Sequence, residues 1–247
     1  MQPYIFPYLG YYQLIHHTDK WVVFDDIQFS SKSWVNRNRI LHPEQNKAWQ
    51  YFTIPIKKHS LSTKINELDI NYQLAWKEQI LGKLSHYKNR APFYRQTINL
   101  INEVFDTSPC KLNNLLVNAL KITCNYLDID FNYQLFSELN FDESVISSPG
   151  DWALHISKKL NASEYINPPG GYSIFSEQSF LNKNIKLSFL TSDLPDYNQN
   201  RKPSIPALSI IDVMMWNSVT DIKNMLKQYK LQTFQELSKN DKALEIK

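Results

Sequence analysis

Short apolar runs typical of strands occupy the first third of the chain. Residues 21–24 form a continuous run of β-forming side chains that ends in two carboxylates, which predicts a buried strand of a parallel or mixed sheet. Residues 48–56 are a second strand candidate, closed by Pro55, and the alternation over residues 63–70 predicts a third, half-buried strand. Between the first two candidates, residues 30–41 have the composition of a polar loop.

The apolar period becomes helical from residue 72 to about residue 128. Three segments in this stretch repeat their apolar residues three and four positions apart, which predicts amphipathic helices over residues 72–89, 93–105 and 111–129. The elements predicted further along are a short helix at 151–162, a strand at 185–190 and an apolar helix at 209–217.

This order of elements predicts the fold class. Strands first, helices in the middle and mixed elements later indicate one α/β domain over residues 1–228. Its N-terminal sheet is expected to be mixed or parallel, with a helical insertion at about 72–128. Residues 229–247 carry mixed charge and show no apparent core partner, so we expect a frayed tail there.

Composition narrows the classes of protein. The chain of 247 residues is 43% hydrophobic and 21% charged, which is typical of a globular protein. A net charge of +3, with no block of more than two consecutive Lys or Arg, argues against nucleic-acid binding. No apolar run reaches the roughly 20 residues of a membrane span, and no export signal is visible, so we expect a cytoplasmic protein. Cys110 and Cys124 form no metal or disulfide pattern and are interpreted as reduced core residues.

Two adjacent carboxylates end the first predicted strand. Ligands in open α/β sheets bind at the carboxyl ends of strands, which makes Asp25 and Asp26 candidate catalytic residues. Neighbouring side chains on a strand point to opposite faces, so one carboxylate is expected to be structural and the other to face a cleft. The alternative is that both merely end the strand. His16 is a third catalytic candidate, provided that the opening segment lines the cleft.

The densest polar cluster follows shortly after. Trp34, Asn36, Arg37, Asn38 and Arg39 lie within six residues. An Arg fork suits a phosphate or carboxylate, an Asn amide suits sugar hydroxyls or base edges, and an indole can stack on a ring. The alternative interpretation is a solvated loop.

A stiff turn later in the chain uses two of only five glycines. Asn167, Gly170 and Gly171 lie in this turn, where the backbone is expected either to adopt positive φ or to let a ligand approach closely. Neither phosphate-loop motif occurs in the chain, so a plain turn is the alternative. No histidine pair has metal-binding spacing and no nucleophile motif is present, so no metal is expected and the cofactor is undefined.

Five segments together resemble the WbqC-like protein family, in the family's order from residue 2 to about residue 217. The segments are QPYIFPYLGYYQLI, DKWVVFDDIQF, WVNRNRI, EYINPPGGYSIF and ALSIIDVMMWN. The resemblance implies a bacterial protein, often encoded in surface-polysaccharide (O-antigen) clusters near sugar-nucleotide aminotransferases. It also implies three groups of signature residues: Gln2, Pro3, Tyr4, Pro7, Gly10 and Tyr11; Asp25, Asp26, Trp34, Asn36, Arg37 and Asn38; and Asn167, Gly170, Gly171, Ser209 and Asp212.

The chain departs from the family pattern at its start. The resemblance implies a few apolar residues before the Gln-Pro pair, whereas Met1 directly precedes Gln2 here, so we expect either that the sheet lacks a first strand or that the start codon is misplaced. The turn-then-helix opening also resembles nucleotidyltransferase-like folds, which bind phosphate at this loop. The comparable residues 7–11 carry tyrosines where those enzymes have histidines.

Taken together, these features predict an enzyme that tailors a sugar nucleotide or amino sugar of surface polysaccharide, by acyl or aminoacyl transfer. The Arg/Asn/Trp cluster would hold the nucleotide or its phosphates, and Asp25 or Asp26 would orient an amine or act as general base. We expect residues 2–12, 25–38 and 167–171 to converge on one hollow. The alternative is a non-catalytic partner of another polysaccharide-pathway enzyme, which would bind through an aromatic-rich surface. The residues predicted to bind substrate are Gln2, Tyr4, Gly10, Tyr11, Trp34, Asn36, Arg37, Asn38, Asn167, Gly170 and Gly171.

Overall fold

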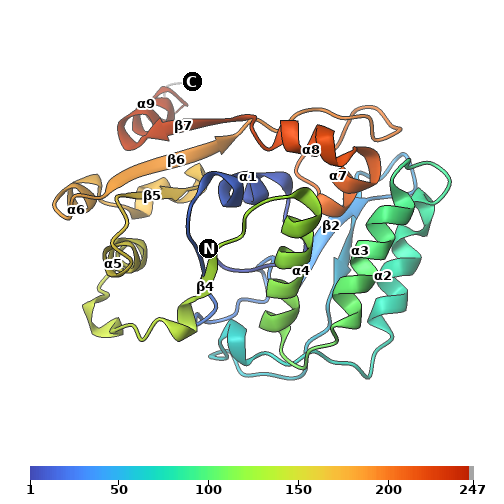
Figure 1. The fold of residues 1–247 in the computed structure, drawn as a ribbon, viewed down its shortest axis with the longest axis horizontal. Helices are drawn as coiled ribbons and strands as arrows, with labels where there is room; N and C mark the ends of the chain where they lie inside the picture. Colours follow the sequence, from blue (N-terminus) through green and yellow to red (C-terminus); the bar gives the residue numbers. More distant parts are fainter. Residues whose placement is uncertain (245–247) are drawn as a thin grey trace. The chain divides into compact units, whose positions relative to one another are not determined.

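The computed structural model describes residues 1–244 and divides into two compact units (Figure 1). Unit 1 comprises Met1–Leu139 and Leu194–Lys227, and unit 2 comprises Asn140–Asp193 together with the chain from Gln228 onward. The mixture of helices and strands confirms the predicted α/β class. The domain boundaries differ from the single domain expected over residues 1–228.

Unit 1 contains two small sheets. Strand β1 (Trp21–Val23) pairs in parallel with β4 (Tyr133–Leu135), which confirms the predicted buried parallel strand although it is only three residues long. The opposite side of β1 hydrogen-bonds to Met1, whose amino group donates to the Val22 carbonyl at 2.8 Å. Strand β2 (Arg37–Leu41) pairs antiparallel with β3 (Trp49–Thr53).

The predicted helical stretch is confirmed as three helices of unit 1. They are α2 (Trp76–Leu84), α3 (Tyr94–Asp106) and α4 (Leu112–Leu127), and α3 packs along α4 (Figure 1). Each helix buries one stripe of apolar side chains because its apolar residues recur with the helical period. The other helices of unit 1 are α1 (Leu9–His17), α7 (Ile210–Trp216) and α8 (Val219–Met225).

Two local predictions in unit 1 were wrong. Residues 30–41, expected to be a loop, contain strand β2. Asn38 and Ile40 point into the core while the two arginines point outward, and this alternation of buried and outward side chains suits a strand. Residues 63–70, expected to be a strand, contain a 3-10 helix at Ile65–Glu67. The Glu67 side chain accepts a hydrogen bond from the backbone N–H of Lys64 and so closes this turn.

Unit 2 is built on a three-stranded sheet (Figure 1). Strand β6 (Lys186–Ser192) is central, parallel to β5 (Glu164–Asn167) and antiparallel to β7 (Tyr229–Thr233). Its helices are α5 (Asp151–Lys159), α6 (Glu177–Leu181) and α9 (Phe234–Leu244). The apolar core of this unit contains Leu154, Phe175, Phe180, Ile185, Leu187 and Phe189.

The C-terminal segment is therefore part of unit 2, and the expectation of a frayed tail is wrong for residues 229–244. Strand β7 pairs with β6 along five residues, and Phe234 and Leu237 of α9 pack against the apolar core. Residues 245–247 of the expected tail lie outside the described residues. Within the described residues, no helix has the length and apolar character needed to cross a bilayer.

Candidate functional site

The outward face of the β2–β3 pair gathers the Arg and aromatic side chains of unit 1. The antiparallel register aligns Arg39 with Tyr51, and the alternation of side chains along each strand puts Arg37 and Trp49 on the same face. The opposite face is buried, with Asn38 only 4% exposed. The two arginines are therefore held at the surface of a rigid hairpin, among exposed and half-buried aromatic rings.

Arg39 lies between two indoles. Its guanidinium carbon is 5.0 Å from the ring centroid of Trp34 and 5.1 Å from that of Trp49. One terminal nitrogen makes a long hydrogen bond of 3.4 Å to the Ala207 carbonyl. Among the described residues, the buried Nε of Arg39 finds no acceptor. Arg39 thus keeps one donor that no described residue satisfies.

The opening loop lies beside this arginine. Burial raises the pKa of the half-buried Tyr4, and the neighbouring Tyr8 phenol raises it further. A hydrogen bond with the Tyr8 backbone and the positive charge of Arg39 act in the opposite direction, so the Tyr4 phenol lies near both groups. Helix α1 starts at Leu9, and Tyr8 supplies no side-chain cap. An uncapped helix N-terminus and a guanidinium both favour a negatively charged guest.

Two non-glycine residues in the segments beside Arg39 have a left-handed backbone. Phe6 has φ 42° and Ala207 has φ 54°. This conformation costs on the order of 1–3 kcal/mol per residue and persists only where other contacts impose it. The Phe6 carbonyl accepts hydrogen bonds from Asn38 and from Ser209, each at 2.7 Å. The backbone N–H of Ser209 donates to the Arg39 carbonyl at 2.9 Å, which ties the three segments together.

We call this cluster the Arg39 site. All of its members belong to unit 1. The site consists of Tyr4, Tyr8, Trp34, Arg39, Trp49 and Ala207.

Of the predicted binding residues, Tyr4 and Trp34 contribute to the Arg39 site and several others hold the scaffold. The Tyr11 hydroxyl donates to the Gln2 carbonyl at 3.0 Å, and Gly10 is buried in the first turn of α1. The Asn36 amide donates to the Ile54 carbonyl at 2.9 Å. Asn38 likewise uses its amide on backbone carbonyls of the opening loop.

Arg37, which was preferred over Arg39 as a substrate clamp, uses its donors internally. Its Nε and one terminal nitrogen donate to the carbonyls of Ser33 and Lys32, and its guanidinium lies over Tyr51. Trp49 and Ala207 are not among the residues predicted from the sequence. The spacing of Trp49 and Tyr51, two apart like the arginines, was the available signal for Trp49, because it places both rings on one face of a strand.

The double-glycine turn belongs to unit 2. Asn167 ends β5, and Gly170 and Gly171 lie in a 3-10 helix at Pro169–Ile174. The expectation of positive φ was wrong for both glycines. A Cβ placed on Gly170 would meet no atom within 4 Å. A substrate-binding role for these three residues stays a prediction.

Asp25 is a buried structural carboxylate by its contacts. It has no exposed surface and accepts hydrogen bonds from the Asn113 amide at 3.0 Å and from the Ser137 backbone N–H and hydroxyl at 3.0 and 2.8 Å. Its own backbone carbonyl accepts from Asn66. Asp25 therefore joins the end of β1 to α4 and to the segment after β4.

Asp26 points to a different set of partners, as the alternation along an extended chain predicts. Its carboxylate forms an ion pair with Lys64 at 2.9 Å and accepts from the Asn66 amide at 3.2 Å. His16 is largely exposed near the C-terminus of α1. Its partial burial is the main cause of a lowered pKa, and the positive charge of Lys227 lowers this pKa further. Among the described residues, no three His, Cys, Asp or Glu side chains gather as a metal site. Catalytic roles for Asp25, Asp26 and His16 stay predictions.

A second buried carboxylate lies in the first turn of α7. Asp212 accepts hydrogen bonds from the hydroxyls of Tyr87 and Tyr197 and from the Gln199 amide. Gln199 in turn donates to and accepts from the backbone of Ile205. Asp212 thereby anchors residues 197–205, the segment that leads to Ala207 of the Arg39 site. Burial raises the pKa of Asp212 above its ordinary value, although the three hydrogen bonds oppose this.

This raised pKa predicts a pH dependence of stability. In the window above the ordinary value of 3.8 the folded state binds more protons at Asp212 than the unfolded state does, so its contribution to the free energy of unfolding falls as pH rises. The isosteric Asp212→Asn variant lacks this titration. We expect the free energy of unfolding of the wild type, measured in urea between pH 4 and pH 8, to decline with rising pH relative to that of Asp212→Asn. A constant difference between the two proteins would contradict the assignment.

Comparison with known proteins agrees with the resemblance seen in the sequence. The family model described as "WbqC-like protein family" matches residues 2–224. The chain is also similar to the uncharacterized protein Rv1507c of Mycobacterium tuberculosis (strain ATCC 25618 / H37Rv), with 25% identity over 214 residues that cover 84% of this chain and 88% of that protein. No solved structure matches significantly. Since the family model covers most of the chain, including every residue of the Arg39 site, the protein belongs to the WbqC-like family.

Proposed function

We propose that this protein binds a nucleotide-linked sugar through its phosphates at the Arg39 site and tailors the amino sugar in surface-polysaccharide biosynthesis. The observation that carries the proposal is Arg39 itself, which is stacked between two indoles with a buried Nε that has no acceptor among the described residues. The resemblance implies that members of the family are often encoded in surface-polysaccharide (O-antigen) clusters, and this supports the choice of pathway. The proposal also implies that the protein acts in the cytoplasm, because nucleotide sugars are cytoplasmic metabolites.

The chemistry of the Arg39 site suits both halves of such a ligand. The planar fork of a guanidinium suits phosphate oxygens. Trp34 is 40% exposed and Tyr51 is 36% exposed, so each ring offers part of its surface to a sugar or base. The phenol of Tyr4 adds a hydrogen-bond donor for hydroxyl groups.

For the transfer step, the proposal assigns acyl or aminoacyl transfer to the amino group of the sugar. A general base must reach the proton that it removes. Asp26, with a side chain 22% exposed, and the exposed His16 are more accessible than the enclosed Asp25. The proposal therefore keeps Asp26 and His16 as base candidates and gives Asp25 a structural role.

The test is calorimetric titration with amino sugars linked to UDP, dTDP or GDP. We expect the wild type to bind one of them and Arg39→Gln to bind it about tenfold to a hundredfold more weakly, because charge-assisted hydrogen bonds contribute about 1.5–3 kcal/mol. Arg39→Lys should recover only part of the affinity, since it keeps the charge but loses the planar fork. Arg90→Gln, an exposed arginine of unit 1, is the matched control and should bind like the wild type.

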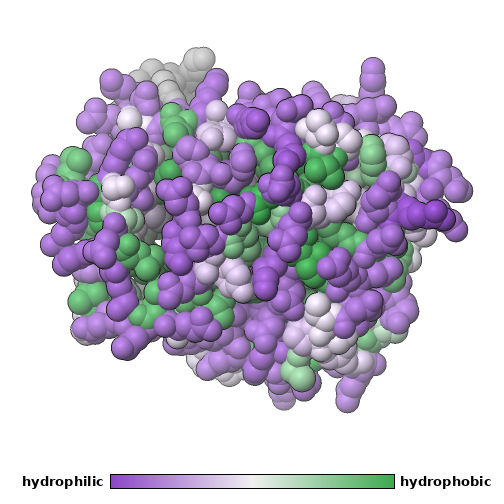
Figure 2. Space-filling model, viewed as in Figure 1, coloured by the Kyte–Doolittle hydropathy of each residue, from purple (hydrophilic) through white to green (hydrophobic). Residues whose placement is uncertain are grey.

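Failure of the wild type to bind any of these nucleotide sugars, or equal affinity of Arg39→Gln, would overturn the proposal. The non-catalytic alternative calls for an exposed aromatic patch, which the opening segment would form with Tyr4, Phe6 and Tyr8. Phe6 is fully buried, and Tyr4 and Tyr8 are half-buried. Figure 2 shows one face of the molecule on which hydrophilic side chains predominate and apolar ones lie in small groups.

A further inference from the structure

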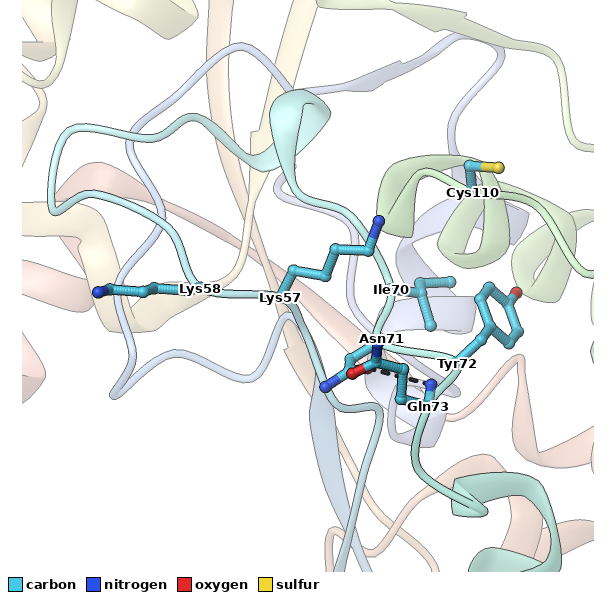
Figure 3. Close-up of a pocket in the computed structure, with 7 residues that line it drawn as sticks. All are labelled: Lys57, Lys58, Ile70, Asn71, Tyr72, Gln73 and Cys110. Atoms are coloured by element: carbon cyan, nitrogen blue, oxygen red, sulfur yellow. Dashed lines mark hydrogen bonds between the residues drawn. The ribbon is translucent and has the colours of Figure 1, made fainter.

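A surface pocket of about 530 Å³ opens in unit 1 among residues that the Arg39 site does not use (Figure 3). Its volume is within the range of small-molecule sites, about 300–1,000 Å³. The residues that line it are Lys57, Lys58, Ile70, Asn71, Tyr72, Gln73 and Cys110.

Three chain segments pair to make the base of this pocket. Ile56 and Ile70 form an antiparallel bridge, and the Ile70 N–H donates to the Cys110 carbonyl at 2.9 Å. The Tyr72 hydroxyl donates to the Pro109 carbonyl at 2.9 Å and so fixes the ring as one wall. The pocket thus combines an ordered backbone and a fixed aromatic wall with a cationic rim.

The charges at the rim favour an anion. Lys57 extends toward the side of the pocket where Cys110 lies, whereas Lys58 points away from the other labelled residues (Figure 3). The nearby carboxylate of Asp69 is 2.9 Å from the Lys111 ammonium, and that hydrogen bond lowers the pKa of Asp69. Lys57 is 3.7 Å from the same carboxylate, with a side chain that is 62% exposed, so a ligand can recruit it at little cost.

Apolar and polar groups add a second element of recognition. The Tyr72 ring is 42% exposed, so it offers a surface for a ring or short aliphatic group, whereas Ile70 is buried beneath the pocket. Asn71 accepts a hydrogen bond from the Gln73 backbone, which orders the loop that carries both carboxamides. We propose that this pocket binds a small organic anion, with its carboxylate or phosphate at Lys57 and its apolar part against the Tyr72 ring, while Lys58 adds to the positive potential of the rim.

Cys110 provides a built-in reporter of the pocket. Its thiol is exposed, contrary to the expectation of a core residue, whereas Cys124 is buried as expected. Burial also raises the pKa of Cys124 to about 12, which keeps that thiol unreactive in the folded protein. Native thiol titration therefore measures Cys110.

The first test compares two thiol reagents of opposite electrostatic character. Dithiobis(nitrobenzoate) is an anionic aromatic disulfide, and dithiodipyridine is a neutral one. We compare the rate of Cys110 with the anionic reagent, divided by its rate with the neutral reagent, at neutral pH. This ratio should fall about threefold to tenfold in Lys57→Gln/Lys58→Gln, because a local positive potential concentrates the anion. The ratio should stay unchanged in Lys88→Gln, an exposed lysine elsewhere in unit 1. An unchanged ratio in the double variant would overturn the proposal.

The second test asks whether an organic anion occupies the pocket. Phenyl phosphate and benzoate should slow the alkylation of Cys110 by neutral iodoacetamide, and the double lysine variant should lose this protection. Inorganic phosphate should protect more weakly, since it has no group to place against Tyr72. No protection by any of the three, or equal protection by inorganic and phenyl phosphate, would refute the proposed ligand class.

Discussion

Asp25→Ala is expected to lower the free energy of unfolding by about 4 kcal/mol, because it removes three hydrogen bonds to a buried carboxylate and leaves the buried Asn113 amide without this acceptor. The three donors, the Asn113 amide and the Ser137 backbone N–H and hydroxyl, come from α4 and from the segment after β4. Asn113 is only 3% exposed, so water cannot replace the lost carboxylate. Urea unfolding followed by circular dichroism measures the change.

The neighbouring Asp26→Ala variant is the matched control. Its carboxylate takes part in a partly exposed ion pair with Lys64, whose side chain is 39% exposed. Pairs of this kind contribute about 1 kcal/mol or less, so a small loss of stability is expected. An equal loss in the free energy of unfolding in the two variants would contradict the prediction that the buried contacts of Asp25 are more stabilising than the exposed ion pair of Asp26.

Gly150→Ala is expected to destabilise unit 2 by about 3 kcal/mol, because the added methyl group overpacks a backbone contact. A Cβ at Gly150 would lie only 2.2 Å from the carbonyl oxygen of Ile174. Backbone cannot rotate away as a flexible side chain can, so the start of α5 must separate from the 3-10 helix at Pro169–Ile174. Hydrogen exchange of α5 and of strands β5 and β6 should accelerate.

Gly170→Ala is the control within the same unit. A Cβ there meets no atom within 4 Å and the residue does not have positive φ, so the stability should change by roughly 0.5 kcal/mol or less. If Gly150→Ala left hydrogen exchange unchanged, the close packing at Gly150 would be refuted.

The contrast between the two glycine sites shows which details a local pattern can predict. Scarcity of glycine drew attention to Gly170 and Gly171, yet the residue with the tightest surroundings is Gly150. Its neighbour in space, Ile174, is 24 positions away along the chain. No local signal encodes such a contact, because it depends on how two segments of unit 2 pack.

The Arg39 site was predicted in part for a similar reason. The side-chain chemistry of residues 34–39 indicates this cluster, but it cannot decide between Arg37, which the sequence favours, and Arg39, on which the proposal rests. Alternation in a strand puts Arg37 and Arg39 on one face, and only the neighbouring backbone decides which guanidinium uses its donors internally. Ala207 reaches Arg39 across 168 positions of sequence, beyond any periodic pattern.

The sequence by itself determined the α/β class, the three middle helices, the parallel strand β1 and membership of the WbqC-like family. These features follow from the spacing of apolar residues and from the order of the five family-like segments, both of which can be read directly along the chain. The tertiary structure alone decided that Asp25 is enclosed, that residues 229–244 complete the sheet and helices of unit 2, and that Arg39 lies between two indoles. Each of these depends on segments far apart in the chain meeting in space, and the free energy of such contacts exists only once the chain has folded.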